Sequence, residues 1–250
     1  MNRPAALPSQ PFPPADTLAT RGAGIAIIVS AIVSIVAVAM DATPTGKDAR
    51  SVMQSMIALQ QSHQLVHVIA MLCLGGLMFG HTVLSQRLGL RRAPVTAALT
   101  AYGLGTVLMF MATILDGFIS TDIAASFVGK SPEAVQAGYW MIQAIGGIAL
   151  VDIAKVSWVL QSVAVLCWSV ALLRQAGLQR AVGVIGLAAG ALPAITVCVV
   201  GSNMTDNVVV GILLLQAVWN LAAATVLLRD RSASPSVQSK LPARALAQAA

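Results

Sequence analysis

Long apolar segments are the feature of this sequence that most constrains its fold. A helix needs about 20 mainly apolar residues to cross the hydrocarbon core of a bilayer. Five such segments occupy residues 22–40, 65–84, 95–115, 181–200 and 208–228, and a sixth, which contains two charged residues, occupies residues 148–173. Only 10% of all residues are charged, whereas soluble domains carry about 25%. The sequence therefore predicts an all-α protein, a polytopic membrane bundle of six transmembrane helices.

The two ends of the chain differ in composition from its middle. Residues 1–20 include five prolines and little that a core could bury, and residues 231–250 are rich in serine, proline and alanine. Segments of this kind stay disordered because they bury too little apolar surface to offset the entropy lost on folding. We therefore expect disordered tails at 1–20 and 231–250 and a six-helix transmembrane domain at 21–230.

The positions of the charged residues predict how the bundle is oriented. Lys and Arg are retained on the cytoplasmic side of a membrane, near the helix ends. With a cytoplasmic N-terminus, eleven of the fifteen basic residues lie in cytoplasmic segments and seven of the nine acidic residues lie on the opposite face. We expect a bacterial inner (plasma) membrane protein with both tails cytoplasmic, N-in/C-in, and with the connections at 41–64, 117–151 and 201–207 outside.

The expected partners follow from charge and from glycine spacing. A nucleic-acid surface would need basic residues interleaved with aromatic ones, and the sequence has no such cluster, so no nucleic-acid partner is expected. The pairs Gly76/Gly80 and Gly186/Gly190 give the second and fifth helices a small face that another backbone can approach closely. We expect these two helices to be central, and the partners to be the lipid bilayer and either other membrane subunits or further copies of the chain.

All three histidines fall on the second helix. A helix turns by about 100° per residue, which places all three histidines, His63, His67 and His81, on one face of the helix. Along the helix axis, however, His81 lies about 21 Å below His67. The 14-residue spacing of His67 and His81 resembles that of b-type cytochromes, in which one helix supplies ligands to two stacked haems. Such a site needs facing histidines; the chain has none left, and only Met111 lies at the level of His67 as a candidate second ligand. We therefore disfavour haem and expect His81 to pack, or to bond a partner in the third helix or near residues 86–92.

The motif HQLVH, residues 63–67, has the spacing of a zincin helix. Gln64 replaces the glutamate that would act as general base, which argues against a peptidase. The sequence also lacks the nucleophile elbow of hydrolases, the phosphate-binding loop and the dinucleotide fingerprint. These absences favour a protein that is not an enzyme.

Polar residues gather at the outer ends of the helices. His63, His67 and Asp116 form a candidate metal site, because two imidazoles one turn apart and a carboxylate suffice for a first-row divalent ion. Met53 and Met56 would add soft ligands suited to copper. Asp116, Asp152 and Lys155 are candidate ligand-binding residues, since charges within a span usually face a cavity or a partner. We expect the two outer histidines, Asp116 and Asp152 to meet in one polar pocket, with Lys155 beside them and able to pair with Asp152.

Two function classes remain open on this evidence. The first is a small membrane protein that binds or moves a small solute, proton or metal ion through a polar pocket on the outer, periplasmic face. The second is a non-catalytic membrane partner or scaffold subunit, in which the polar residues lie at the interface without a bound ion. A haem-binding electron-transfer subunit is a further alternative. A divalent metal or copper is the cofactor to be tested.

Overall fold

The computed structural model describes residues 17–201 and 204–229. These residues form helices and turns, with no strand among them. The helical elements are α1 (Thr17–Met40), α2 (Ala49–Leu88), α3 (Ala93–Ile114), η1 (Leu115–Ser120), α4 (Thr121–Phe127), α5 (Pro132–Ile142), η2 (Gln143–Ala149), α6 (Leu150–Leu173), α7 (Leu178–Val200) and α8 (Asp206–Arg229). Most of the tail predicted at 1–20, and all of the tail predicted at 231–250, lie outside the described residues, whereas residues 17–20 belong to α1.

These elements join into six continuous rods. The π-helical turns η1 and η2 connect α3 to α4 and α5 to α6 without a break, so the rods run over residues 17–40, 49–88, 93–127, 132–173, 178–200 and 206–229. All six rods are long and apolar enough to cross a membrane. The predicted all-α bundle of six transmembrane helices is confirmed.

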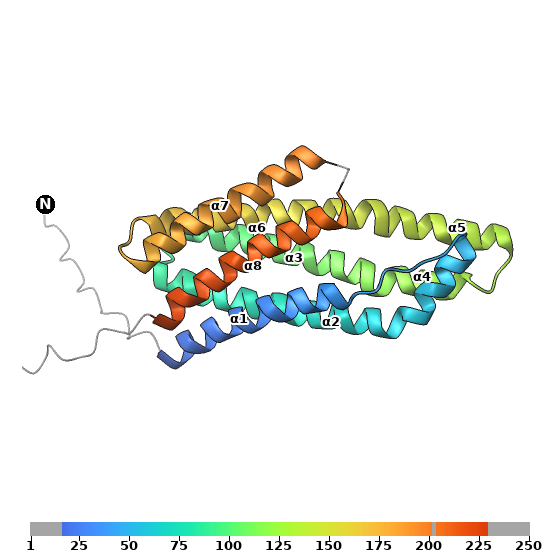
Figure 1. Ribbon diagram of the computed structural model, residues 1–250, viewed down its shortest axis with the longest axis horizontal. Helices are drawn as coiled ribbons and strands as arrows, with labels where there is room; N and C mark the ends of the chain where they lie inside the picture. Colours follow the sequence, from blue (N-terminus) through green and yellow to red (C-terminus); the bar gives the residue numbers. More distant parts are fainter. Residues whose placement is uncertain (1–16, 202–203, 230–250) are drawn as a thin grey trace, which may run out of the picture.

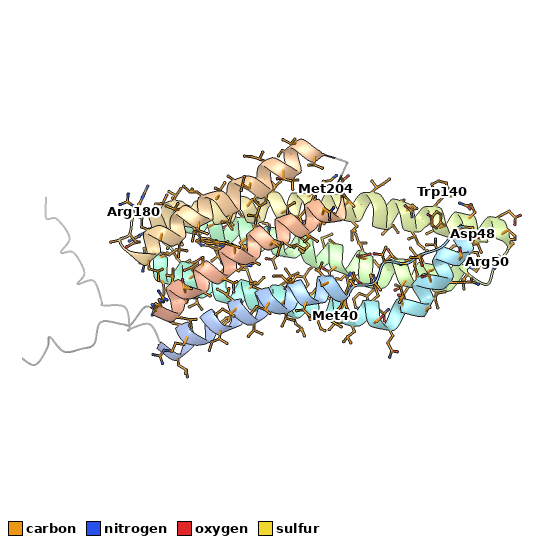
Figure 2. The ribbon with its side chains drawn as sticks, in the orientation of Figure 1. Met40, Asp48, Arg50, Trp140, Arg180 and Met204 are labelled. Carbon is orange, nitrogen blue, oxygen red and sulfur yellow. The ribbon has the colours of Figure 1, made fainter. Side chains whose placement is uncertain are left out.

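Three of the rods are much longer than expected: the connections predicted at 41–64 and 117–151 are reduced to residues 41–48 and 128–131, and the rest of both segments is helical. The 40 residues of α2 extend over about 60 Å, twice the roughly 30 Å of the hydrocarbon core. Figure 2 shows Met40 and Met204 near the middle of the long axis, and Asp48 and Arg50 at one end of it. We call this projecting part, residues 49–63 of α2 with α4 and α5, the extension, and we call its end of the bundle the α4–α5 end (Figure 1).

The extension is helical because it has a core of its own. Met53 and Met56 of α2 are buried there against apolar residues of α4 and α5, namely Ala124, Val135 and Ile142. Burying apolar side chains of this kind stabilises the packing by roughly 1.5–3 kcal/mol for each large residue. Hydropathy predicts only the helical length that a bilayer requires, so it does not predict the further helical turns that pack on one another.

Local contacts fix where the extension begins and how it turns. The Asp48 carboxylate accepts a hydrogen bond from the Ser51 amide, and the Ser51 hydroxyl accepts one from the Asp48 amide, which forms a capping box at the start of α2. This bond from the Ser51 amide holds the pKa of Asp48 below its ordinary value. The Arg50 guanidinium donates to the carbonyls of Val128 and Lys130, in the turn between α4 and α5.

Within the membrane part the rods form a ring in which α7 lies between α6 and α8. α1 packs against α2 and α8, α3 packs against α2 and α6, and α7 packs mainly against α6 and α8, at the edge of the bundle (Figure 1). A Cβ on Gly80 would meet Ile27 of α1, and one on Gly190 would lie 2.9 Å from the Ser162 carbonyl of α6. The close approaches predicted from glycine spacing are present, but the expectation that α7 is central was wrong.

Candidate metal centre

Three segments that are distant in the sequence meet at the level where α1 ends. Asp41 is the first residue after α1, His63 and His67 lie one turn apart in α2, and Asp116 lies in η1. One donor atom from each of these four residues lies within 4.8 Å of the other three. We call Asp41, His63, His67 and Asp116 the His–Asp cluster.

Hydrogen bonds orient both imidazole rings in the same way. His67 Nδ1 lies 2.8 Å from the carbonyl oxygen of His63, and His63 Nδ1 lies 2.7 Å from Asp41 Oδ1. The remaining nitrogens both face Asp116: His67 Nε2 is 3.2 Å from Oδ2, and His63 Nε2 is 3.8 Å from Oδ1. The two rings lie side by side, with centroids 4.3 Å apart. Each histidine therefore has one nitrogen engaged by an orienting partner and one aimed at the same carboxylate.

This arrangement needs positive charge between the rings and Asp116. A carbonyl oxygen only accepts hydrogen bonds, so the Nδ1 of His67 must be the donor to it. In the neutral imidazole the other nitrogen, Nε2, is then a lone pair, and it would face the lone pairs of the Asp116 carboxylate. Two facing acceptors repel one another unless a second proton on the ring or a metal cation lies between them.

The distances match those of a metal site. Tetrahedral zinc has bonds of about 2.0–2.1 Å to histidine nitrogen, which places neighbouring ligand atoms about 3.3–3.5 Å apart. The separations of 3.2 and 3.8 Å between Asp116 and the two Nε2 atoms fall on either side of that range. The Asp116 carboxylate thus lies at about ligand-to-ligand distance from both imidazoles, one oxygen to each ring. Asp41 either orients His63, as carboxylates behind metal-bound histidines commonly do, or supplies a fourth ligand.

The π-helical turn η1 places Asp116 against α2. A π turn adds a residue to the turn and so changes the direction in which the following side chains point, and such turns are frequent at functional sites. Here Asp116 and its neighbour Gly117 both face His67. A Cβ on Gly117 would lie 2.5 Å from the His67 ring, so only glycine allows the η1 backbone to lie directly on the imidazole.

The cluster lies at one end of a long cavity. The cavity has a volume of about 520 Å³ and is lined by α1, α2, α3, α6 and α8, with Asp41, His67 and Asp116 at its α4–α5 end. Asp116 exposes 40% of its side chain, whereas His63 exposes 12%. A solute in the cavity can therefore reach the carboxylate, while the protein covers most of the histidine surface.

Similarity to known proteins does not assign this site. No family model, curated protein or solved structure matches the chain.

The structure places Asp152 and Lys155 away from the cluster. Lys155 Nζ lies 3.1 Å from Asp152 Oδ1, so the two residues pair with each other as expected. Asp152 exposes 67% of its side chain, and neither residue is among those that line the cavity. The predicted convergence of Asp152 with the outer histidines is wrong because α6 is only the inner part of a longer rod, on which Asp152 faces away from the bundle.

The other candidate ligands have packing roles. Met53 and Met56 belong to the core of the extension, and Met111 exposes its side chain on the surface of the bundle. His81 is fully buried, donates through Nδ1 to the Leu77 carbonyl of its own helix, and stacks on Trp168 with centroids 4.8 Å apart. His81 therefore packs, as expected, but its hydrogen bond goes to its own helix rather than to the third helix or to residues 86–92.

Sequence reasoning missed Asp41 as a member of the cluster. This residue follows the first apolar segment directly, at the depth of the outer histidines, and that position was the signal available in the sequence. Its contact with His63 spans 22 positions along the chain, and it depends on how the connection between α1 and α2 folds back. Helical periodicity does not predict such a contact.

Proposed function

We propose that this chain is a small multi-pass protein of a bacterial inner membrane that binds a first-row divalent metal ion at its outer face. The ligands are His63, His67 and Asp116, with Asp41 as orienting residue or fourth ligand. The observation that carries this proposal is the convergence of two imidazole Nε2 atoms on one carboxylate while both Nδ1 atoms are engaged elsewhere.

The donor set limits the metals that fit. Imidazole nitrogen with carboxylate oxygen suits Zn²⁺, Fe²⁺ and Cu²⁺, whereas Cu⁺ prefers sulfur ligands. The methionines that would have favoured copper lie in the core of the extension. Three protein ligands leave a coordination position for Asp41, water or a solute. Zn²⁺ is therefore the probe with which to test the site.

The orientation belongs to the same proposal. With the α4–α5 end outside, most basic residues lie on the cytoplasmic side, as the positive-inside rule requires. The His–Asp cluster then faces the periplasm, from which it takes up metal. Binding there is the first step of moving a cation or a coordinated solute across the membrane.

Metal analysis of the purified protein tests the proposal. We expect about one equivalent of Zn²⁺ per chain after dialysis against micromolar zinc, and loss of most of it in His63→Ala/His67→Ala and in Asp116→Asn, because each change removes donor atoms from the cluster. Asp41→Asn should lower the affinity about 10- to 100-fold, as expected for a partner that orients a ligand. Element analysis and competition with a chromogenic chelator measure these quantities.

Asp152→Asn is the matched control, because this carboxylate lies at the same end of the membrane part but outside the cluster. It should bind zinc as the unaltered protein does. Equal metal content in the unaltered protein and the double histidine variant, with both folded, would refute the metal site.

A proton-binding role is the second candidate, and the two His–Asp hydrogen bonds, His63 to Asp41 and His67 to Asp116, favour it. If both histidines are protonated, the two negative carboxylates and the two positive imidazolium groups together have no net charge. A protein that binds no metal but takes up protons when the cluster is intact would have this role. If the protein neither binds metal nor takes up protons at the cluster, the scaffold function is favoured.

A further inference from the structure

The inner half of the cavity contains a second group of polar side chains. Gln161 of α6 and the pair Gln216 and Asn220 of α8 line it, together with Trp219, and Trp158 lines the cavity three residues before Gln161, about one helical turn nearer the α4–α5 end. Gln161 lies twelve residues before the end of α6 and Asn220 nine residues before the end of α8, which is about 18 and 14 Å along the helices. Half the thickness of the hydrocarbon core is about 15 Å. These residues therefore lie near the middle of the membrane.

Polar side chains at this depth call for a partner. Polar groups within a membrane span are unfavourable unless they face a cavity or pair with one another, and they commonly mark a binding site. Gln161 Nε2 donates to Ser157, whose hydroxyl donates to the Gly105 carbonyl. In the described ranges of the chain, however, Trp158 Nε1, Trp219 Nε1 and Gln216 Nε2 have no hydrogen-bond partner, and neighbouring atoms cover each of them, so these side chains must turn to donate into the cavity.

These three unpartnered atoms are all donors. An indole N–H and an amide NH₂ donate hydrogen bonds and do not accept them, so a matching ligand must offer acceptor oxygens. No acidic or basic side chain lines this half of the cavity, since its charged lining residues belong to the His–Asp cluster. A charged ligand would thus find no counter-ion there. The remaining walls are mainly apolar, with Leu74, Leu77 and Leu213 among them.

We propose that the inner half of the cavity binds a neutral, lipophilic molecule with carbonyl oxygens, the chemical class to which quinones belong. Its carbonyl groups accept hydrogen bonds from Gln216 and from the indoles of Trp158 and Trp219, which turn slightly to meet them, while its apolar body lies against the leucine side chains. The volume of about 520 Å³ is within the roughly 300–1,000 Å³ range of small-molecule sites. This site is separate from the metal ligands and does not depend on them.

Binding of a quinone probe to the full-length protein in nanodiscs tests the proposal. Decylubiquinone is the probe, and decylbenzene, which has the same chain and no carbonyl, is its control. We expect saturable binding of decylubiquinone by calorimetry and no saturable binding of decylbenzene. Trp158→Phe and Gln216→Leu each remove one donor and keep the shape, so each should weaken binding about threefold to tenfold.

Two control variants test where decylubiquinone binds. Trp140→Phe changes an exposed tryptophan of α5 that does not line the cavity, and this variant should bind decylubiquinone with unchanged affinity. His63→Ala/His67→Ala should lose metal and keep quinone binding, which separates this proposal from the metal site. Melting temperatures establish that each variant is folded.

Three results would overturn the proposal. The first is equal binding of decylbenzene, which would show an apolar cavity without carbonyl recognition. The second is unchanged affinity in both donor variants. The third is loss of quinone binding in the double histidine variant, which would place the carbonyl at the His–Asp cluster. The comparison of the two probes on the unaltered protein stands even if a variant fails to fold.

Discussion

At the scale of single residues, helical geometry predicted part of the site and missed the rest. His63 and His67 are four residues apart, which placed them on one face of α2, and Asp116 ends an apolar segment at the matching depth. These three residues could therefore be predicted to meet. Asp41 lies in a connection whose path no periodicity determines, and Asp152 was misplaced because the direction of a side chain on a long rod depends on packing that the sequence does not display.

His81 provides a prediction about packing. His81→Ala should lower the stability by about 2–4 kcal/mol, because it removes a fully buried ring that stacks on Trp168 and contacts Tyr102. His81→Phe keeps a ring of similar shape and removes the buried Nε2, which has no partner among the described residues. We expect it to change stability by about 1 kcal/mol or less. Thermal unfolding in detergent measures both, and equal damage from the two changes would reveal a polar role for His81.

At the scale of elements, the apolar segments predicted where the helices cross the membrane but not how far they continue. The rule that about 20 apolar residues can span a membrane predicted the membrane part of all six rods. The further turns of α2, α4 and α5 are held by the core around Met53 and by Arg50. Contacts of that kind join segments far apart in the sequence, so a single-segment pattern cannot show them.

Substitutions at two glycines of α2 test how closely α1 and α2 pack. A Cβ on Gly80 would meet the Ile27 side chain and lie 3.1 Å from the Ala23 carbonyl of α1, whereas one on Gly75 would have no neighbour within 4 Å. Gly80→Ala should therefore destabilise the protein by about 1–3 kcal/mol through overpacking. Gly75→Ala should stabilise it by up to about 1 kcal/mol, because alanine has the higher helix propensity. Melting temperatures that shift in the same direction for both variants would contradict the α1–α2 contact.

At the scale of the whole molecule, composition and hydropathy predicted the fold class, and charge predicts its orientation. The turn between α4 and α5 and the turn between α2 and α3 lie at opposite ends of the bundle (Figure 1). The first has few basic residues and the second has Arg91 and Arg92. These two turns are therefore the places at which to test the orientation.

Labelling of single cysteines decides between the two orientations. In a variant without Cys73, Cys167 and Cys198, a cysteine at Gly129 should react in intact cells with a maleimide that cannot cross membranes. A cysteine at Leu90 should react only after the cells are permeabilised. The opposite pattern would invert the bundle and place the His–Asp cluster on the cytoplasmic side.

The unequal lengths of the rods have an electrical consequence. The 24 residues of α1 rise about 36 Å, slightly more than the hydrocarbon core, so Asp41 and its partners lie at the boundary of the membrane. Moving one charge across the whole membrane potential changes its energy by about 2.3 kcal/mol per 100 mV. A cation held at the boundary has crossed almost none of that field, so its occupancy should not depend on voltage. A charged molecule beside Gln216 would experience about half of the potential, and a neutral carbonyl compound would experience none.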